Sequence, residues 1–441
     1  MFDPACVAVV GASPSGKQGN VFVQGLLDPG FKGDAFVVHP TASEVMGLPA
    51  YPRVSALPRR PDLAILVLPS EPAIEVVRDC AKVGVPGVAL FTAGFNELGT
   101  EEGHARARAL LEAAGGKTRL IGPNGMGIYN PRRGVAMFPK MSQRTGSIGF
   151  ISQSGSLTSF TVRDAAERGL GFSAAVSMGN QLDLNAADFL EYFGEDPETQ
   201  VIGAYVEGVP DGRRFQRVLR DVASRKRVIL WKAGRVAAGA KAAHSHTGQL
   251  AGSYAVWQGL ARQAGAILVR EADELVDTLV AANALLRTRQ SGRRVAIVTG
   301  PGGPAVSASD ACEEAGLALA ELSEDSRSKL REVVAAAGTS VANPIDVGMA
   351  LVGATELYRR CLEVALADPG VDAALVIGVS RGDSGGFAEM LADVTRETGK
   401  PLMYVVGPEQ QDRRMLEMLA EAGVATAPTA ERALRAYARV A

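Results

Sequence analysis

The chain has 441 residues, too many for one ordinary hydrophobic core, so we expect two to three domains. Apolar residues make up 47% of the sequence and charged residues 21%, which is typical of a folded globular protein. The 46 Lys and Arg nearly balance the 48 Asp and Glu, and no stretch combines basic with aromatic residues. These features exclude nucleic acid and membrane surfaces as expected partners. No basic leader precedes the first apolar run, and no apolar run approaches the roughly 18 residues of a membrane span. We therefore expect a cytoplasmic protein.

The four cysteines lie far apart in the sequence and form no CxxC pair. Their spacing predicts neither a zinc site nor a redox pair. We expect four free and mostly buried thiols.

Three times the chain runs from β-branched residues through a glycine-rich turn into a helix-like segment, at residues 7–13, 148–155 and 295–302. Each opening is followed by further short apolar strands that alternate with amphipathic stretches, which is typical of parallel sheets covered on both faces. The charged, non-periodic stretches 140–145 and 287–294 separate the repeats. The sequence therefore predicts three consecutive α/β parallel-sheet modules. Because ligands of such sheets bind at the carboxyl ends of strands, the three glycine turns are the candidate sites.

The first glycine loop, residues 11–18, comes within one residue of the phosphate-binding pattern GxxxxGK[ST]. Gln18 stands where a hydroxyl group would hold magnesium, which argues against a nucleoside triphosphate site. The dinucleotide pattern GxGxxG is absent, and the second strand ends at His39-Pro40 instead of an acidic residue, which argues against NAD. A diphosphate seat on a helix N-terminus and a plain strand-to-helix turn both remain open here.

Segments 67–70, 92–97 and 121–127 complete a pattern that resembles the CoA-binding domain of succinyl-CoA synthetase and its NDP-forming acyl-CoA synthetase relatives. In that family the adenosine diphosphate part of CoA lies over these strand ends. The sequence departs from the family at His39-Pro40-Thr41, where Asn-Pro-Lys is frequent and the Lys lies near a CoA phosphate. The resemblance implies CoA contacts from Gly11, Ser13, Gln18, Pro69 and Asn124.

Two of the four histidines, His244 and His246, share one polar segment. Taken alone, such a pair is either part of a metal site or two solvated histidines in a polar loop. No further metal ligands are spaced nearby in the sequence, so no metal site is expected. Ser245-His246-Thr247-Gly248 resembles the phosphohistidine loop of the same family. The resemblance implies that His246 is the nucleophile, with His244 as its neighbour. The family landmarks occur in order at 151–155, 178–180, 188–192, 196–199 and 205–208.

A phosphohistidine needs a carboxylate on its second ring nitrogen and donors for its phosphoryl group. Glu207, at a strand end, matches the family's carboxylate partner, and a solvated strand-end carboxylate is the alternative. Ser154-Gly155-Ser156 opens a helix whose N-terminal N–H groups would receive the phosphate.

The third module has a glycine turn at 299–304 and the segment 343–348, which resemble the C-terminal domain that succinyl-CoA synthetase carries on its other subunit. The resemblance implies phosphate contacts from Gly302 and Gly303, and a plain tight turn stays open as the alternative.

The resemblance covers essentially the whole chain. It implies a Rossmann-like CoA-binding domain at 1–140, a central flavodoxin-like ligase domain at 145–288, a C-terminal flavodoxin-like ligase domain at 293–441, and no ATP-grasp domain. The implied reaction interconverts acyl-CoA, phosphate and NDP with a small carboxylic acid, CoA and NTP, through an acyl phosphate and phosphohistidine. Magnesium and nucleotide would bind an ATP-grasp β subunit in a hetero-oligomer.

Two rival functions remain at this point. One is a nucleotide-independent acyl or carbamoyl transferase of the same superfamily. The other is a non-catalytic CoA-binding module, which the missing lysine at Thr41 would favour.

Overall fold

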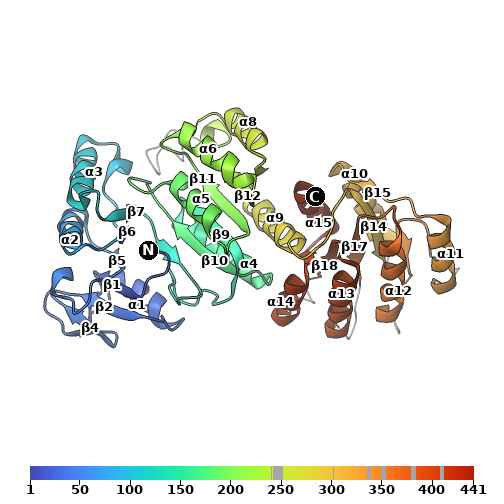
Figure 1. Ribbon diagram of the computed structural model, residues 1–441, viewed down its shortest axis with the longest axis horizontal. Coiled ribbons are helices and arrows are strands. Elements are labelled where there is room, and N and C mark those ends of the chain that lie inside the picture. The colour runs from blue at the N-terminus through green and yellow to red at the C-terminus, as the bar shows by residue number, and fades with distance from the viewer. Residues whose placement is uncertain are drawn as a thin grey trace. The chain divides into compact units, whose positions relative to one another are not determined.

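The computed structural model describes residues 1–239, 241, 252–300, 302–334, 339–348, 354–378, 384–407 and 412–441. The chain divides into two compact units, one made of Met1–Arg163 with Gly171–Arg270 and the other of Asp164–Leu170 with Glu271–Ala441. Three mostly parallel sheets confirm the predicted α/β fold class (Figure 1).

The first sheet has the order β3-β4-β2-β1-β5-β6-β7, and only β3 and β4 pair in antiparallel fashion. Every residue of β1 is buried, because helices cover both faces of this sheet. Helix α3 shows how the helices are bounded, since the Thr100 side chain accepts a hydrogen bond from Gly103 N and Gly115 closes the helix in the left-handed conformation. The elements are β1 Cys6–Val10, α1 Gly19–Leu27, β2 Asp34–Val38, β3 Glu44–Val45, β4 Leu48–Tyr51, β5 Leu63–Leu66, α2 Ser70–Val83, β6 Gly87–Leu90, α3 Glu101–Ala114 and β7 Arg119–Ile121.

The second sheet has the order β13-β12-β11-β9-β10-β8, with β8 alone antiparallel to its neighbour. Helices α5 and α6 pack together, and α8 packs on α6 (Figure 1). A capping box formed by Asn185 and Asp188 begins α5. The elements are β8 Gly127–Tyr129, β9 Thr145–Ser152, α4 Gly155–Glu167, β10 Phe172–Ser177, α5 Ala186–Glu195, β11 Val201–Val206, α6 Gly212–Ala223, β12 Arg227–Lys232, α8 Tyr254–Ala264 and β13 Ile267–Val269.

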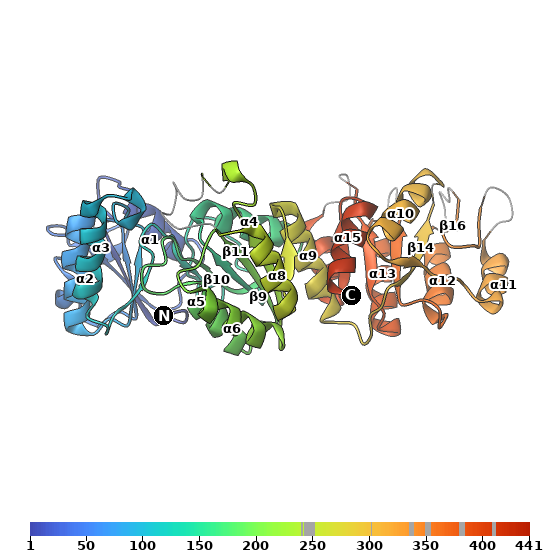
Figure 2. The same ribbon diagram turned by 90° about the horizontal axis from the view of Figure 1, so that it is seen from above.

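The third sheet has the order β15-β14-β17-β18-β19, and β16 pairs with the carboxyl end of β14. Helices α9, α15 and α10 pack in series (Figure 2), and α12 and α13 pack together on the other face of the sheet (Figure 1). The buried Asp277 of α9 accepts hydrogen bonds from Arg168 and Arg432, which ties segment 164–170 to this unit. The elements are α9 Ala272–Leu285, β14 Arg294–Thr299, α10 Gly302–Glu314, β15 Ala318–Leu319, α11 Glu324–Val333, β16 Ile345–Asp346, α12 Ala354–Ala367, β17 Ala373–Ile377, α13 Ser384–Thr398, β18 Leu402–Val405, α14 Arg413–Ala422, β19 Val424–Ala427 and α15 Ala430–Val440.

All three sheets share one topology, in which the chain winds first to one side of the opening strand and then to the other. The strands flanking this reversal are β1 and β5 in the first sheet, β9 and β11 in the second, and β14 and β17 in the third. Ligands of doubly wound sheets bind outside the carboxyl ends of strands at this point. The glycine turns singled out by the sequence follow β1, β9 and β14, and each therefore lies at a topological switch point.

All four cysteines are free and buried, as the sequence predicts. Among the helices of the described residues, none is long and apolar enough to cross a membrane.

Candidate functional site

The glycine loop after β1 is shaped by a close backbone approach and by one amide side chain. Gly11 has φ +105°, and a Cβ there would lie 2.1 Å from the carbonyl oxygen of Val67, so only glycine fits. Asn20 Oδ1 accepts hydrogen bonds from the backbone N–H of Ser13 (3.0 Å) and Lys17 (2.9 Å), while its Nδ2 donates to the Ser13 carbonyl oxygen (2.9 Å). The loop is therefore held in shape by the protein itself. Sequence reasoning missed Asn20, although an amide in the first turn of a helix after a glycine loop is a usable sign.

The residues expected to contact CoA follow three parallel strands of one sheet. Gly11, Ser13 and Gln18 follow β1, Pro69 follows β5, and Asn124 follows β7. Ser13 is buried, whereas Gln18 and Pro69 are exposed. Because the strands are parallel, the structure brings all three loops to one edge of the sheet.

This edge is joined to the second sheet through loop 178–182. The N–H of Asn180 donates to the Pro123 carbonyl oxygen (2.9 Å), and that of Leu182 to the Gly122 carbonyl oxygen (3.1 Å). The Asn180 side chain donates to Glu97 Oε2 (2.5 Å), and Glu97 Oε1 accepts from the backbone N–H of Gly94 (2.5 Å). Both sheets belong to one compact unit, so the predicted CoA edge adjoins the carboxyl end of β10.

The segment expected to receive phosphate is the turn from β9 into α4. Ser152 and Ser154 form a tight local turn, in which Ser154 N–H donates to Ser152 Oγ (3.1 Å) and Ser152 Oγ to the Ser154 carbonyl oxygen (2.9 Å). Gly155 begins α4, and a Cβ there would lie 2.4 Å from Met126 Cγ. Ser156 is exposed at the helix N-terminus.

Glu207 follows β11, the strand beside β9, and its side chain is only 5% exposed. Tyr205 donates its hydroxyl to Glu207 Oε1 (3.1 Å). Burial raises the pKa of Tyr205, and the Glu207 carboxylate adds to the shift, so the phenol stays a neutral donor. The structure thus brings Glu207 and the Ser154–Ser156 turn to one topological switch point.

Two buried glutamines fix the turn at Glu207. Gln153 Oε1 accepts from the backbone N–H of Glu207 (2.5 Å) and Gly208 (3.0 Å). Gln181 Nε2 donates to the Gly208 carbonyl oxygen (2.9 Å), and its Oε1 accepts from the N–H of Ala186 (2.9 Å). The backbone turn that carries Glu207 is therefore held from the ends of β9 and β10, which lie on one side of β11.

Lys232 ends β12 beside β11 and is 1% exposed, a residue that sequence reasoning missed. Its ammonium group donates to the Ala233 carbonyl oxygen and lies 5.5 Å from the centre of the Trp257 ring. Burial lowers the pKa of Lys232, and the nearby Glu207 carboxylate works against that shift. The sequence feature that could have indicated Lys232 is its position as a charged residue at the end of the apolar run 228–231.

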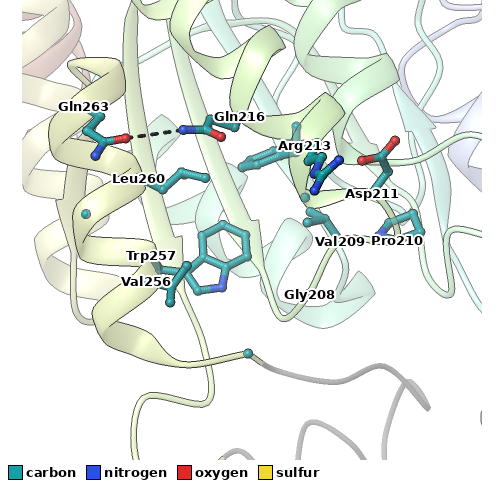
Figure 3. A pocket seen from close by; sticks show the side chains of 14 residues that line it. Gly208, Val209, Pro210, Asp211, Arg213, Gln216, Val256, Trp257, Leu260 and Gln263 are labelled. Carbon is teal, nitrogen blue, oxygen red and sulfur yellow. Dashed lines mark hydrogen bonds between the residues drawn. The ribbon is translucent and has the colours of Figure 1, made fainter.

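A pocket of about 740 Å³ adjoins Glu207 through Gly208 (Figure 3). The turn 208–212 and helices α6 and α8 line it. Phe215 and Trp257 pack with ring centres 5.5 Å apart in its wall, and Gln216 Nε2 donates to Gln263 Oε1 (3.3 Å). The pocket offers apolar aromatic surface beside a helix N-terminus.

The third glycine turn lies in the other compact unit. Gly302 and Gly303 are exposed at the start of α10, and beyond the helix backbone no heavy atom of the described residues lies within 4 Å of a Cβ built on Gly303. Asn343 anchors the neighbouring segment, because its Oδ1 accepts from Ile297 N–H (2.8 Å) and its Nδ2 donates to the Val295 carbonyl oxygen (2.8 Å).

His246 and His244 lie outside the described residues. Among those that are described, no three His, Cys, Asp or Glu side chains gather as metal ligands.

Three family models match the chain, namely a CoA binding domain over residues 5–131, a succinyl-CoA ligase-like flavodoxin domain over 145–282 and a ligase-CoA domain over 295–400. The alpha subunit of ADP-forming acetate–CoA ligase II from Pyrococcus furiosus is 36% identical, with 100% of this chain and 96% of that protein aligned. The chain belongs to the ADP-forming acetate–CoA ligase family. The resemblance found in the sequence is thereby confirmed.

Two further members of the ligase family bear on the chain's extent and fold. ADP-forming acetate–CoA ligase I of Archaeoglobus fulgidus is 40% identical over 86% of this chain, which spans about half (54%) of that protein. The dinucleotide-forming acetyl-coenzyme A synthetase 1 of Candidatus Korarchaeum cryptofilum, solved with phosphate and ADP, superposes with a TM-score of 0.87 at 34% identity, covering 100% of this chain and 95% of that one.

A double-mutant cycle can measure the electrostatic coupling between Lys232 and Glu207 in this ligase-family chain. We expect Lys232→Met to destabilise the wild-type chain more than it destabilises Glu207→Gln, by about 1 kcal/mol or more, because the buried carboxylate loses its nearby cation only in the first case. Chemical denaturation of the four proteins measures the coupling. Lys232→Met combined with Glu198→Gln, a change at an exposed carboxylate, is the matched control and should be additive. Additivity at Glu207 within about 0.5 kcal/mol would show that the two charges are not coupled.

Proposed function

We propose that this chain is the CoA-binding, phosphohistidine-carrying subunit of an ADP-forming acyl-CoA ligase. The observation that carries the proposal is that one compact unit joins the CoA-type strand edge to the edge holding Glu207 and the Ser154–Ser156 turn. A thioester lying over the first edge would have its sulfur end near the second.

The proposed chemistry has three steps. A phosphate oxygen attacks the thioester carbonyl carbon, the C–S bond breaks, and CoA leaves while an acyl phosphate forms. A ring nitrogen of His246 then attacks phosphorus, and the carboxylic acid leaves as its carboxylate. In the last step a terminal oxygen of ADP takes the phosphoryl group from the histidine.

In this scheme the chain's polar groups have separate tasks. Glu207 accepts the N–H of the other imidazole nitrogen of His246, which orients the ring and supports its positive charge during transfer. Ser154, Gly155 and Ser156 at the N-terminus of α4 supply donors to phosphate oxygens. For Gly302 and Gly303 at the N-terminus of α10 we propose phosphate contacts as well. Gly11, Ser13, Gln18, Pro69 and Asn124 contact CoA.

We further propose that an ATP-grasp β subunit holds magnesium and nucleotide, in a cytoplasmic hetero-oligomer that acts on a small carboxylic acid. The Pyrococcus furiosus relative is named a subunit alpha, which supports a partner. The phosphate-loop-like segment 11–18 gives the nucleotide no magnesium ligand at Gln18, and Asn20 already uses its amide to shape that loop.

The phosphohistidine assignment is tested by labelling. Incubation with acyl-CoA and radioactive phosphate should give an acid-labile, base-stable protein label that His246→Asn abolishes. Glu207→Gln should keep the fold and slow label formation by about 100-fold, the scale of a positioned base or its support. His244→Asn is the matched control. Full labelling of His246→Asn would refute the assignment.

CoA binding is tested by calorimetric titration. Asn20→Ala should weaken CoA binding about tenfold, since it removes three hydrogen bonds that shape the loop after β1. Thr41→Lys should strengthen it severalfold by restoring a cation near a CoA phosphate. NADH binding with no CoA binding would contradict the proposal.

The subunit assignment predicts that the purified chain, given acyl-CoA, phosphate and ADP, releases no more than about one equivalent of CoA and makes no ATP. Addition of the ATP-grasp partner should start repeated turnover. Repeated ATP formation by this chain alone would overturn the assignment.

A further inference from the structure

The side chain of Gln153 is the least explained group at the switch point of the second sheet. It is 1% exposed, and its Oε1 is used twice, by the N–H groups of Glu207 and Gly208. Two converging donors require an acceptor, so the amide cannot be turned around, and Nε2 must point away from the β11 turn. Nε2 has no hydrogen-bond partner among the described residues.

A buried amide donor without a partner costs about 1–3 kcal/mol, so its retention calls for a ligand. Gln153 directly precedes the Ser154–Ser156 turn, where the N-terminus of the 13-residue helix α4 presents further N–H groups. A side-chain donor without a partner and the N-terminus of a helix therefore adjoin in the chain at this switch point. That combination suits a tetrahedral oxyanion.

The surrounding charges also suit a site that binds an anion and then releases it. On β11, Tyr205 is a neutral donor to Glu207 Oε1. On β12, the buried cation Lys232 interacts electrostatically with the Glu207 carboxylate. On the β10 side, Asn180 and Gln181 carry no charge, and Glu97 is bound by Asn180. Among the described residues, the charges that bear on this turn are thus the Glu207 carboxylate and the Lys232 ammonium group.

We propose that Gln153 has two roles: its Oε1 positions Glu207, and its Nε2 binds an oxygen of inorganic phosphate or of the transferred phosphoryl group. Binding of the transferred phosphoryl group rests on the proposed function, whereas binding of inorganic phosphate rests on the described residues alone. Gln153 is thus a positioning residue for Glu207 and a direct ligand of phosphate.

Gln153→Glu separates the two roles, because a carboxylate still accepts both N–H groups but replaces the donor by a negative oxygen. We expect phosphate binding to weaken by about tenfold or more near pH 8 and to recover near pH 6, because burial raises the pKa of the new carboxyl group and the protonated form donates again. Gln153→Met, which lacks both groups, should stay weak at both pH values.

The probe is inorganic phosphate at about 20 mM, and the readout is the rise in melting temperature of the full chain, taken relative to wild type at the same pH. Gln200→Glu is the control, since it makes the same charge change at an exposed residue whose Nε2 donates to Pro197. If Gln153→Glu does not fold, Gln153→Met carries the test.

Wild-type-like phosphate stabilisation of Gln153→Met would overturn the proposal, and so would a wild type that phosphate does not stabilise. Loss of stabilisation in Gln153→Glu at both pH values would also overturn the donor role. If phosphate stabilises the chain as expected but no phosphoenzyme forms with acyl-CoA, the proposed function fails while the phosphate ligand stands.

Discussion

The candidate site depends on how a buried carboxylate is held at the end of a strand. An ionised group that leaves water loses several kcal/mol unless neighbouring dipoles replace its hydration. Here the replacement is built from backbone geometry. Gln153 after β9 and Gln181 after β10 fix the turn after β11, and the Tyr205 hydroxyl donates to the carboxylate of Glu207 itself. Because three strand ends share this turn, displacing any one of them would move the carboxylate.

The first two sheets are linked by an equally close backbone contact. A Cβ on Gly179 would lie 2.2 Å from the Pro123 carbonyl oxygen, so the loops after β7 and β10 approach backbone to backbone. Such contact leaves no room for a side chain at position 179.

The repeated pattern of apolar strand, glycine turn and helix was enough to predict three α/β modules, since both the parallel pairing and the burial of strands such as β1 leave direct traces in the sequence. Sequence reasoning, guided by the family resemblance, pointed to Glu207 and the Ser154–Ser156 turn at strand ends, and their roles stay predictions. It could not find the roles of Asn20, Gln181 or Lys232. Their partners are backbone groups or rings up to 27 positions away, and no local pattern encodes which loop an amide will contact. Strand β8 was missed for a related reason, since its antiparallel place beside β10 depends on tertiary packing.

The state of the cysteines has a consequence for a chain that matches a CoA binding domain. Burial raises the pKa of Cys80 and Cys361 to about 12 and that of Cys6 and Cys312 to about 11, so almost no thiolate exists near neutral pH. Thiol–disulfide exchange proceeds through the thiolate and requires access to it. Oxidised CoA dimers or other small disulfides would therefore find no sulfur on this chain with which to form a mixed disulfide, and the chain would remain unmodified while the thiol pool around it changes its redox state.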